Sequence, residues 1–422
     1  MRNAVGSTKG AIPSLVDMRE TLNTYKAQIA RGRIAVCYHY FAHYREPVNQ
    51  ELIEAGEFRY EFFGETHSYD SGIKLTTKFA DDRFHRVRGW TIGPMLIQPA
   101  VIRLALSPKY KAIILLGNPK WPTMWAAAIL GRLTGKRVLM WTHGWLNAER
   151  GPKRVIRNIF HRLSHSLLVY GHRAKNIGVK HMGFSPDRIH VIYNSLDTKL
   201  QDKIRATITK EEVAQIRSDL FGDRAHHPVL INVTRLHPVK KLDLLLEAAA
   251  ELEQQGTPVN VLIVGDGPHR PDLEALAAQL GVTARFAGAV YDERELALMF
   301  TGADLTVMPG PIGLLVMHSL AYGTPVISND DFDSQMPEVE AIVDGQTGSY
   351  FKANDVTSMV SAIKEWIDRD DDPDQRRARA REMIAKYYNP VSQRQLIDRA
   401  VRGDSPDDLS FPRLRTLPGV SR

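Results

Sequence analysis

Short runs rich in Val, Ile and Leu alternate along this chain with helix-length amphipathic stretches, and the alternation starts afresh after the middle. Strands that are buried on both faces of a parallel sheet read as such unbroken apolar runs, with helices between them. The sequence therefore predicts an α/β fold of doubly wound parallel sheets. The expected strands are 33–37, 112–116, 137–142, 166–170 and 189–193, then 228–233, 260–264, 284–288, 304–308 and 325–328.

The length of 422 residues favours two domains, since one hydrophobic core seldom organises so long a chain. A polar, charged stretch near 197–225 contains no expected strand and marks the boundary. We expect an N-terminal domain at 1–200 and a C-terminal domain at 201–387. A helix at about 388–402 follows the break at Asn389-Pro390. The Pro-, Asp- and Arg-rich segment 403–422 is expected to be a flexible tail.

Cysteine content and hydropathy indicate in which cellular compartment the protein is expected. Cys37 is the only cysteine of the sequence, which excludes an internal disulfide and a cysteine-rich metal cluster. The first 20 residues hold no apolar core of signal-peptide type, and no window of 18 or more apolar residues occurs. We expect a cytoplasmic protein without a transmembrane span.

Positive charge is concentrated in one part of the chain. Residues 101–200 contain 17 Lys and Arg against three Asp and Glu, and the densest part, 150–175, has apolar residues at helical spacing. Two readings stay open: a solvated helix face, or a patch for an anionic substrate or membrane surface, such as the inner face of the plasma membrane. Nucleic acid is not expected, because no aromatic and basic interleaving accompanies the charge.

Three loops follow expected strands of the second half. The first carries Arg235 and Lys240 before an amphipathic helix that Asp243 could cap. The second, "VGDGP", contains Gly265 but lacks the third glycine of a dinucleotide fingerprint. The third, "PGPIGLL" from Pro309, leads into a helix. Cations and the first amides of a helix favour binding of a phosphate. The alternative is that Arg235 and Lys240 are ordinary exposed loop cations that bind no ligand.

The segments "VTRLHPVKKLDLLLEA", "LIVGDGP", "IGLLVMHSLAYGTPVI" and "PEVEAIVDGQTGSYF", in this order and spacing, resemble the C-terminal half of the family-four glycosyltransferases. "MWTHGWL" and "VIYNSLD" extend the resemblance to the first half less specifically. The resemblance implies the GT-B fold, in which two Rossmann-like domains face each other across a cleft. It also implies transfer of a sugar from a nucleoside-diphosphate sugar, generally with retention and without a metal or other cofactor.

The resemblance also assigns residues. Arg235 and Lys240 match the basic pair that holds the leaving diphosphate, and His143 falls near a histidine that touches the transferred sugar in some relatives. The C-terminal domain is then the donor domain, and the helix at 388–402 crosses back to an acceptor domain. The donor-binding residues implied are Gly265, Val290, Gly310, Ile312, Gly313, Leu314, Leu315 and His318.

Two positions depart from the family's pattern. Relatives commonly carry one glutamate where Gly310 stands and another where His318 stands, and a glycine where Lys241 stands. Three hypotheses follow: an active enzyme in which His318 meets the ribose, an inert sugar-nucleotide-binding subunit, or a scaffold that keeps the fold.

The acceptor side is expected after the first strand. His39, Tyr44 and Arg45 lie there and could stack on a sugar or pair with a phosphate, or else pack on their own domain. Together with the basic region, they predict a glycan or lipid-linked acceptor in bacterial-type surface polysaccharide or glycolipid assembly.

Overall fold

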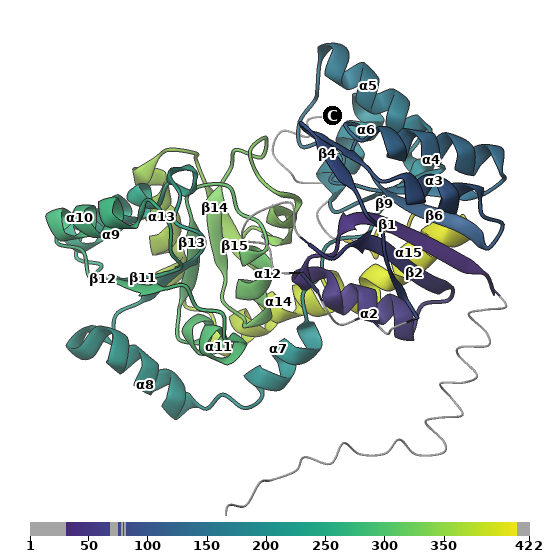
Figure 1. Cartoon of the computed structure of the whole chain (residues 1–422). Helices are drawn as coiled ribbons and strands as arrows, with labels where there is room; N and C mark the ends of the chain where they lie inside the picture. The colour runs from purple at the N-terminus through teal and green to yellow at the C-terminus, as the bar shows by residue number, and fades with distance from the viewer. Residues whose placement is uncertain (1–30, 68–74, 77–78, 80–81, 412–422) are drawn as a thin grey trace, which may run out of the picture.

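Two parallel sheets organise the chain (Figure 1) in a computed structural model that describes residues 31–67, 75–76, 79 and 82–411. Within these residues the first sheet has seven strands in the order β3-β2-β1-β6-β7-β8-β9. The second has six, in the order β12-β11-β10-β13-β14-β15. All neighbouring strands pair in parallel. Each sheet therefore gathers the carboxyl ends of its strands at one edge, where open α/β sheets bind ligands.

The first sheet comprises β1 (Arg33–Tyr40), β2 (Arg59–Glu65), β3 (Phe84–Arg86), β6 (Tyr110–Leu116), β7 (Arg137–Trp141), β8 (Ser166–Val169) and β9 (Ile189–Val191). The second comprises β10 (Val229–Val233), β11 (Asn260–Val264), β12 (Ala284–Gly288), β13 (Leu305–Met308), β14 (Val326–Asn329) and β15 (Gly348–Phe351). An antiparallel hairpin is formed by β4 (Trp90–Ile92) and β5 (Met95–Ile97).

The α-helices of the first half are α2 (Glu46–Glu54), α3 (Pro99–Leu106), α4 (Pro122–Leu133), α5 (Gly151–Arg162) and α6 (His172–Lys180). Those that follow are α7 (Thr198–Arg205), α8 (Lys210–Phe221), α9 (Leu242–Gln254), α10 (Arg270–Leu280), α11 (Glu293–Thr301), α12 (Leu315–Ala321), α13 (Val356–Ile367), α14 (Pro373–Lys386) and α15 (Pro390–Arg402). Short 3-10 turns are η1 (His43–Arg45), η2 (Pro186–Arg188), η3 (Gly222–Arg224), η4 (Pro238–Lys240) and η5 (Pro337–Ala341).

The ten expected strands are all present, and the predicted doubly wound α/β class is confirmed. The sequence prediction missed β2, β3, β15 and the hairpin. Strand β2 is buried throughout but carries charged residues, which hid it from a search for apolar runs. Its Glu61 accepts hydrogen bonds from Arg59, Tyr110 and Lys109 at 2.7–3.1 Å. Burial opposes ionisation, but these donors hold the pKa of Glu61 at about 2, so the buried charge is compensated.

The chain passes between the halves twice. Helix α7 follows β9 and packs on α11 and α12, and α8 packs on α11. After β15, α14 packs on α12, and the chain then turns at Asn389, whose side chain caps α15. Helix α15 returns to the first half, where it lies against α2, β7, β8 and β9 (Figure 1).

The segment after Gly403 corrects an expectation. It was predicted to fray, but residues 404–411 pack on the first half. Phe411 is buried and stacks on His172 with ring centroids 5.0 Å apart, and Tyr193 donates to the backbone oxygen of Asp408 at 2.9 Å. Aromatic burial of this kind outweighs the local Pro and Asp content. Residues 412–422 lie outside the described part of the chain.

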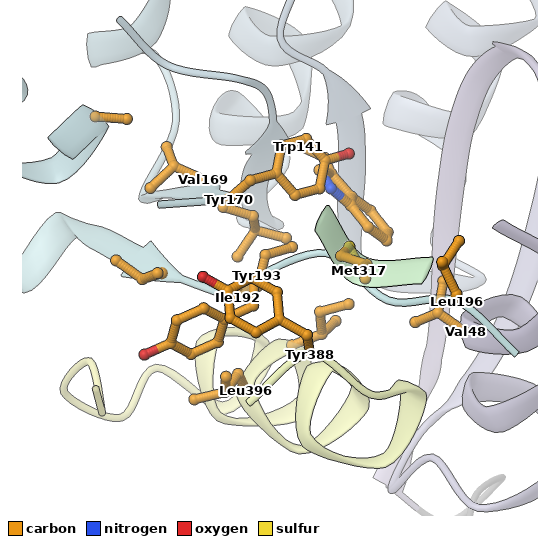
Figure 2. Close-up of a cluster of buried hydrophobic side chains, with 14 of the residues drawn as sticks. Val48, Trp141, Val169, Tyr170, Ile192, Tyr193, Leu196, Met317, Tyr388 and Leu396 are labelled. Carbon is orange, nitrogen blue, oxygen red and sulfur yellow. The ribbon is translucent and has the colours of Figure 1, made fainter. Parts of the chain in front are cut away.

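A buried apolar cluster joins the two halves. Figure 2 shows Met317 of α12 among first-half side chains such as Trp141 and Leu196, with Tyr388 approaching from the turn before α15. A second cluster fills the far side of the second sheet, between α9, α10 and α13. The contact between the halves is therefore part of the hydrophobic core.

Candidate active site

The loops after β10 and β11 meet at the carboxyl edge of the second sheet, because these strands are neighbours. Gly265 has φ of +136°, and a Cβ there would lie 1.8 Å from the backbone oxygen of Thr234. Its N–H donates to the oxygen of Gly288 at 2.7 Å. Only glycine fits this approach, so the expected close-packed glycine turn is present.

The loop after β13 contacts the same β10 loop. A Cβ on Gly310 would lie 2.4 Å from the oxygen of Val239 and 2.7 Å from Cα of Lys240. The Nζ of Lys240 donates to the oxygen of Pro311 at 2.7 Å. This contact explains why no acid stands at 310: the backbone of the lysine loop occupies the space that its side chain would need.

The two cations of the β10 loop differ in environment. Arg235 is exposed, whereas Lys240 is half-buried, and burial lowers the pKa of Lys240. The next residue, Lys241, has φ of +51° in the left-handed region, which accounts for the glycine that relatives carry there. Helix α9 starts at Leu242. Its N-cap residue is Lys241, whose side chain forms no capping hydrogen bond. The expectation that Asp243 caps this helix is therefore wrong, although Asp243 lies in its first turn.

The start of α12 offers fewer amides than expected. The N–H of Ile312 donates to Oε1 of Gln335 at 2.8 Å, so it is not available to a ligand. Helix α12 begins at Leu315, and its N-cap Leu314 provides no side-chain cap. Among the described residues, the N–H groups of Gly313, Leu314 and Leu315 have no protein acceptor, so these are the amides left to meet an anion. The sequence prediction missed Gln335, which no local pattern singles out.

His318 belongs to a different group of side chains. Its Nδ1 lies 3.3 Å from Nε2 of Gln201 and 3.8 Å from Oε1 of Glu293. Glu293 also accepts from Tyr322 at 2.7 Å. Burial lowers the pKa of His318, against the opposing effect of Glu293. The half-buried Val290 lies shortly before Glu293 at the start of α11. Glu293 was not predicted, because its role depends on two helices meeting.

The first half contains a pocket of about 830 Å³ at the carboxyl ends of β1, β6 and β7. Among the residues that line it are His39, Tyr44 and Arg45, predicted from one stretch after the first strand, and His143, predicted from another. The β4–β5 hairpin and Arg157 of α5 also line it. The structure thus brings together the whole predicted acceptor set and His143.

Arg45 is held by aromatic side chains. Its guanidinium donates to the hydroxyl of Tyr38 at 3.1 Å and to that of Tyr170, and it lies 4.9 Å from the ring centroid of Trp141. Within the described chain it forms no ion pair with a carboxylate. Phenol and ring contacts keep a cation in place without neutralising it. Tyr170 and Trp141 were missed, because both read as ordinary strand residues.

The surroundings of His143 favour its neutral form. Desolvation and the charge of Arg45 lower the pKa of His143 to about 4. The ring of His143 lies 5.1 Å from that of Tyr170. A neutral imidazole can accept or donate a single hydrogen bond to a sugar hydroxyl without adding charge.

Acidic residues of η5 join the two halves. Glu340 accepts from the backbone N–H groups of His172 and Arg173, both at 2.7 Å, and so caps α6 of the other half. Glu338 accepts from Nδ2 of Asn194 at 2.8 Å, while its buried Oε2 has no protein partner. Burial raises the pKa of Glu338, with a smaller opposing effect from Arg45.

Comparison with known proteins agrees with this geometry. Residues 221–383 match the family described as Glycosyl transferases group 1. Over 88% of this chain, the fold resembles the crystal structure of Anabaena Alr3699/HepE in complex with UDP, with a TM-score of 0.65, 15% identity and 99% of that chain covered. A glycosyltransferase from Rickettsia africae gives a TM-score of 0.66 at 14% identity, over 89% of this chain and 99% of that one. The chain has the GT-B fold, and the part that matches the group 1 glycosyl transferases lies in its C-terminal half.

Relatives of this GT-B protein carry several substrate names. A GDP-mannose-dependent alpha-(1-6)-phosphatidylinositol monomannoside mannosyltransferase of Mycolicibacterium smegmatis is 28% identical over 40% of this chain and 44% of its own length. A D-inositol 3-phosphate glycosyltransferase of Nocardia farcinica is 32% identical over 44% of this chain and 42% of its own length. The chain thus spans less than half the length of these relatives.

Proposed function

We propose that this GT-B protein is a glycosyltransferase that moves a sugar from a nucleoside-diphosphate sugar to a glycan or lipid-linked acceptor. The donor binds the C-terminal half, the acceptor binds the pocket of the N-terminal half, and transfer proceeds with retention and without a metal. The setting is bacterial-type surface polysaccharide or glycolipid assembly on the cytoplasmic side of a membrane.

The observation that carries this proposal is the meeting of three loops at one sheet edge. The β10 loop supplies Arg235 and Lys240, and the β13 loop supplies the free amides before α12. When the bond from the sugar to the diphosphate breaks, negative charge grows on the leaving phosphate oxygen. Fixed cations and amides stabilise that charge without reorganisation. The structure of Alr3699/HepE with UDP shows that a protein of this fold holds a nucleoside diphosphate.

The acceptor pocket favours a negatively charged molecule. Its lining residues include Arg45 and Arg157 and, within the described chain, no Asp or Glu. Arg157 is paired with Glu149 at 3.0 Å, which leaves Arg45 as the lining arginine that forms no ion pair within the described chain. A phosphate bound in the pocket would supply that partner through charge-assisted hydrogen bonds. The acceptor is therefore phosphorylated, as the name of the Nocardia farcinica relative indicates for its own substrate.

Glu293 and Glu338 supply the carboxylates that positions 310 and 318 lack. Glu293, with His318, lies on the side of α12 where the resemblance places the ribose, and a carboxylate suits a pair of ribose hydroxyls. Glu338 interacts electrostatically with Arg45 of the acceptor pocket, and its unpartnered Oε2 can accept from a hydroxyl of the transferred sugar. The acidic groups are thus supplied from α11 and η5.

A donor panel tests the proposal. Nucleoside diphosphates and their sugars are screened by thermal shift and by hydrolysis, first on the wild type and then on Lys240→Met. Loss of the clamp should slow turnover by about 2–4 kcal/mol of barrier. Lys241→Met is the matched control, since the adjacent Nζ bonds Asn354 instead. Stabilisation without turnover would indicate an inert binder, and no stabilisation would indicate a scaffold.

A further inference from the structure

Helix α5 presents its aliphatic side chains outward. Val155, Ile156 and Ile159 are 56%, 51% and 51% exposed, although they share one face of the helix. The opposite face is buried through Asn158 and His161. Phe160, next to the stripe, is also buried, and its ring lies 4.9 Å from that of Trp125 on α4. An amphipathic surface helix normally turns its aliphatic stripe toward the domain. In α5 that stripe is instead open to the surroundings.

The charges around this stripe are all of one sign. Helix α5 contains Lys153, Arg154, Arg157 and Arg162 and no acidic residue, and Arg150 precedes it. The nearest acid in sequence, Glu149, is paired with Arg157. The surface therefore combines exposed aliphatic groups with uncompensated positive charge, as interfacial helices do.

A second apolar element lies at the same pocket. The β4–β5 hairpin exposes Trp90 (60%), Ile92 (57%) and Met95 (38%). Met95 lines the acceptor pocket from the hairpin, and Arg157 lines it from α5. Both elements lie on the side of the first half that faces away from α2 and α15 (Figure 1). Tryptophan with aliphatic neighbours is favoured at the headgroup level of a bilayer.

We propose that α5 and the β4–β5 hairpin together dock the N-terminal half onto an anionic lipid bilayer, with the acceptor pocket opening at the lipid surface. A bilayer satisfies both properties of the patch, because acyl chains accept the apolar side chains while anionic headgroups neutralise the bases. Docking is independent of turnover. Its corollary, which rests on the proposed function, is that the phosphorylated acceptor reaches Arg45 from a lipid.

Vesicle sedimentation of the full chain tests the docking. Wild type should bind vesicles containing phosphatidylglycerol at low salt, bind less at high salt, and bind little to pure phosphatidylcholine. A V155S/I156S/I159S variant should lose about tenfold or more in affinity, since three apolar groups leave the interface. A W90S/I92S variant should also bind more weakly. The matched control is L200S/V391S, which replaces exposed apolar residues on α7 and α15 and should bind as wild type does.

Circular dichroism and thermal unfolding establish that each variant is folded. Equal binding of wild type to neutral and anionic vesicles would overturn the proposal, as would wild-type binding by the triple variant or equal loss in the control. If vesicle binding behaves as expected while no sugar nucleotide is turned over, the docking stands and the proposed function fails.

Discussion

Gly310→Ala tests the contact between the β13 loop and the lysine loop. The added methyl would overlap backbone atoms of Val239 and Lys240 at 2.4 and 2.7 Å, and backbone cannot rotate out of the way as a side chain can. We expect about 1–3 kcal/mol for the overpacking. A further ~1.5–3 kcal/mol follows if the charged bond from Lys240 to Pro311 is lost. Urea unfolding measures the sum. Gly313→Ala is the matched control, because its Cβ would meet only Met336 at 3.7 Å.

The same substitution should weaken donor binding, since it displaces the lysine clamp. The KM for the sugar nucleotide should rise while the acceptor KM stays near its wild-type value. A Gly310→Ala protein with the unfolding free energy of Gly313→Ala and an unchanged donor KM would refute the reasoning. It would mean that the two loops are not in contact in the working protein.

Three further predictions concern other parts of the molecule. Glu340→Gln should lower the free energy of unfolding by about 1–2 kcal/mol, measured in urea, because the charged cap of α6 is lost; an unchanged value would contradict the capping role. Glu293→Gln and His318→Ala should each raise the donor KM about tenfold, or about 1.4 kcal/mol; unchanged donor binding would mean that both only pack. Burial lowers the pKa of His161 to about 3 and of His190 to about 4 in the folded chain. As the pH falls, the unfolded chain therefore binds protons at these histidines before the folded chain does. Stability should be full at about pH 7.5, fall as the pH passes the unfolded value of about 6.5, and be lower by about 2 kcal/mol per histidine at about pH 5. His190→Gln should flatten that dependence, and an equal slope would argue against it.

The prediction of strands succeeded where burial on both sheet faces forces an apolar run, and it failed at β2. There Glu61 and Arg59 are buried as a charged pair, and Glu61 is further compensated by Tyr110 of β6 and by Lys109 just before it. No local pattern reveals such compensation. The prediction of a flexible tail after Gly403 failed for a related reason. Phe411 packs against aromatic rings that lie far away in sequence.

The sequence by itself determined the two parallel sheets, the loops that carry Arg235 and Lys240, and the group 1 pattern of the second half. These features depend on periodicity and on neighbouring residues. Only the tertiary structure decided which groups meet: that Gly310 leaves no room for an acid, that Gln335 takes the Ile312 amide, and that Glu293 stands beside His318. Contacts between residues distant along the chain arise from packing, and no local pattern in a single sequence reveals them.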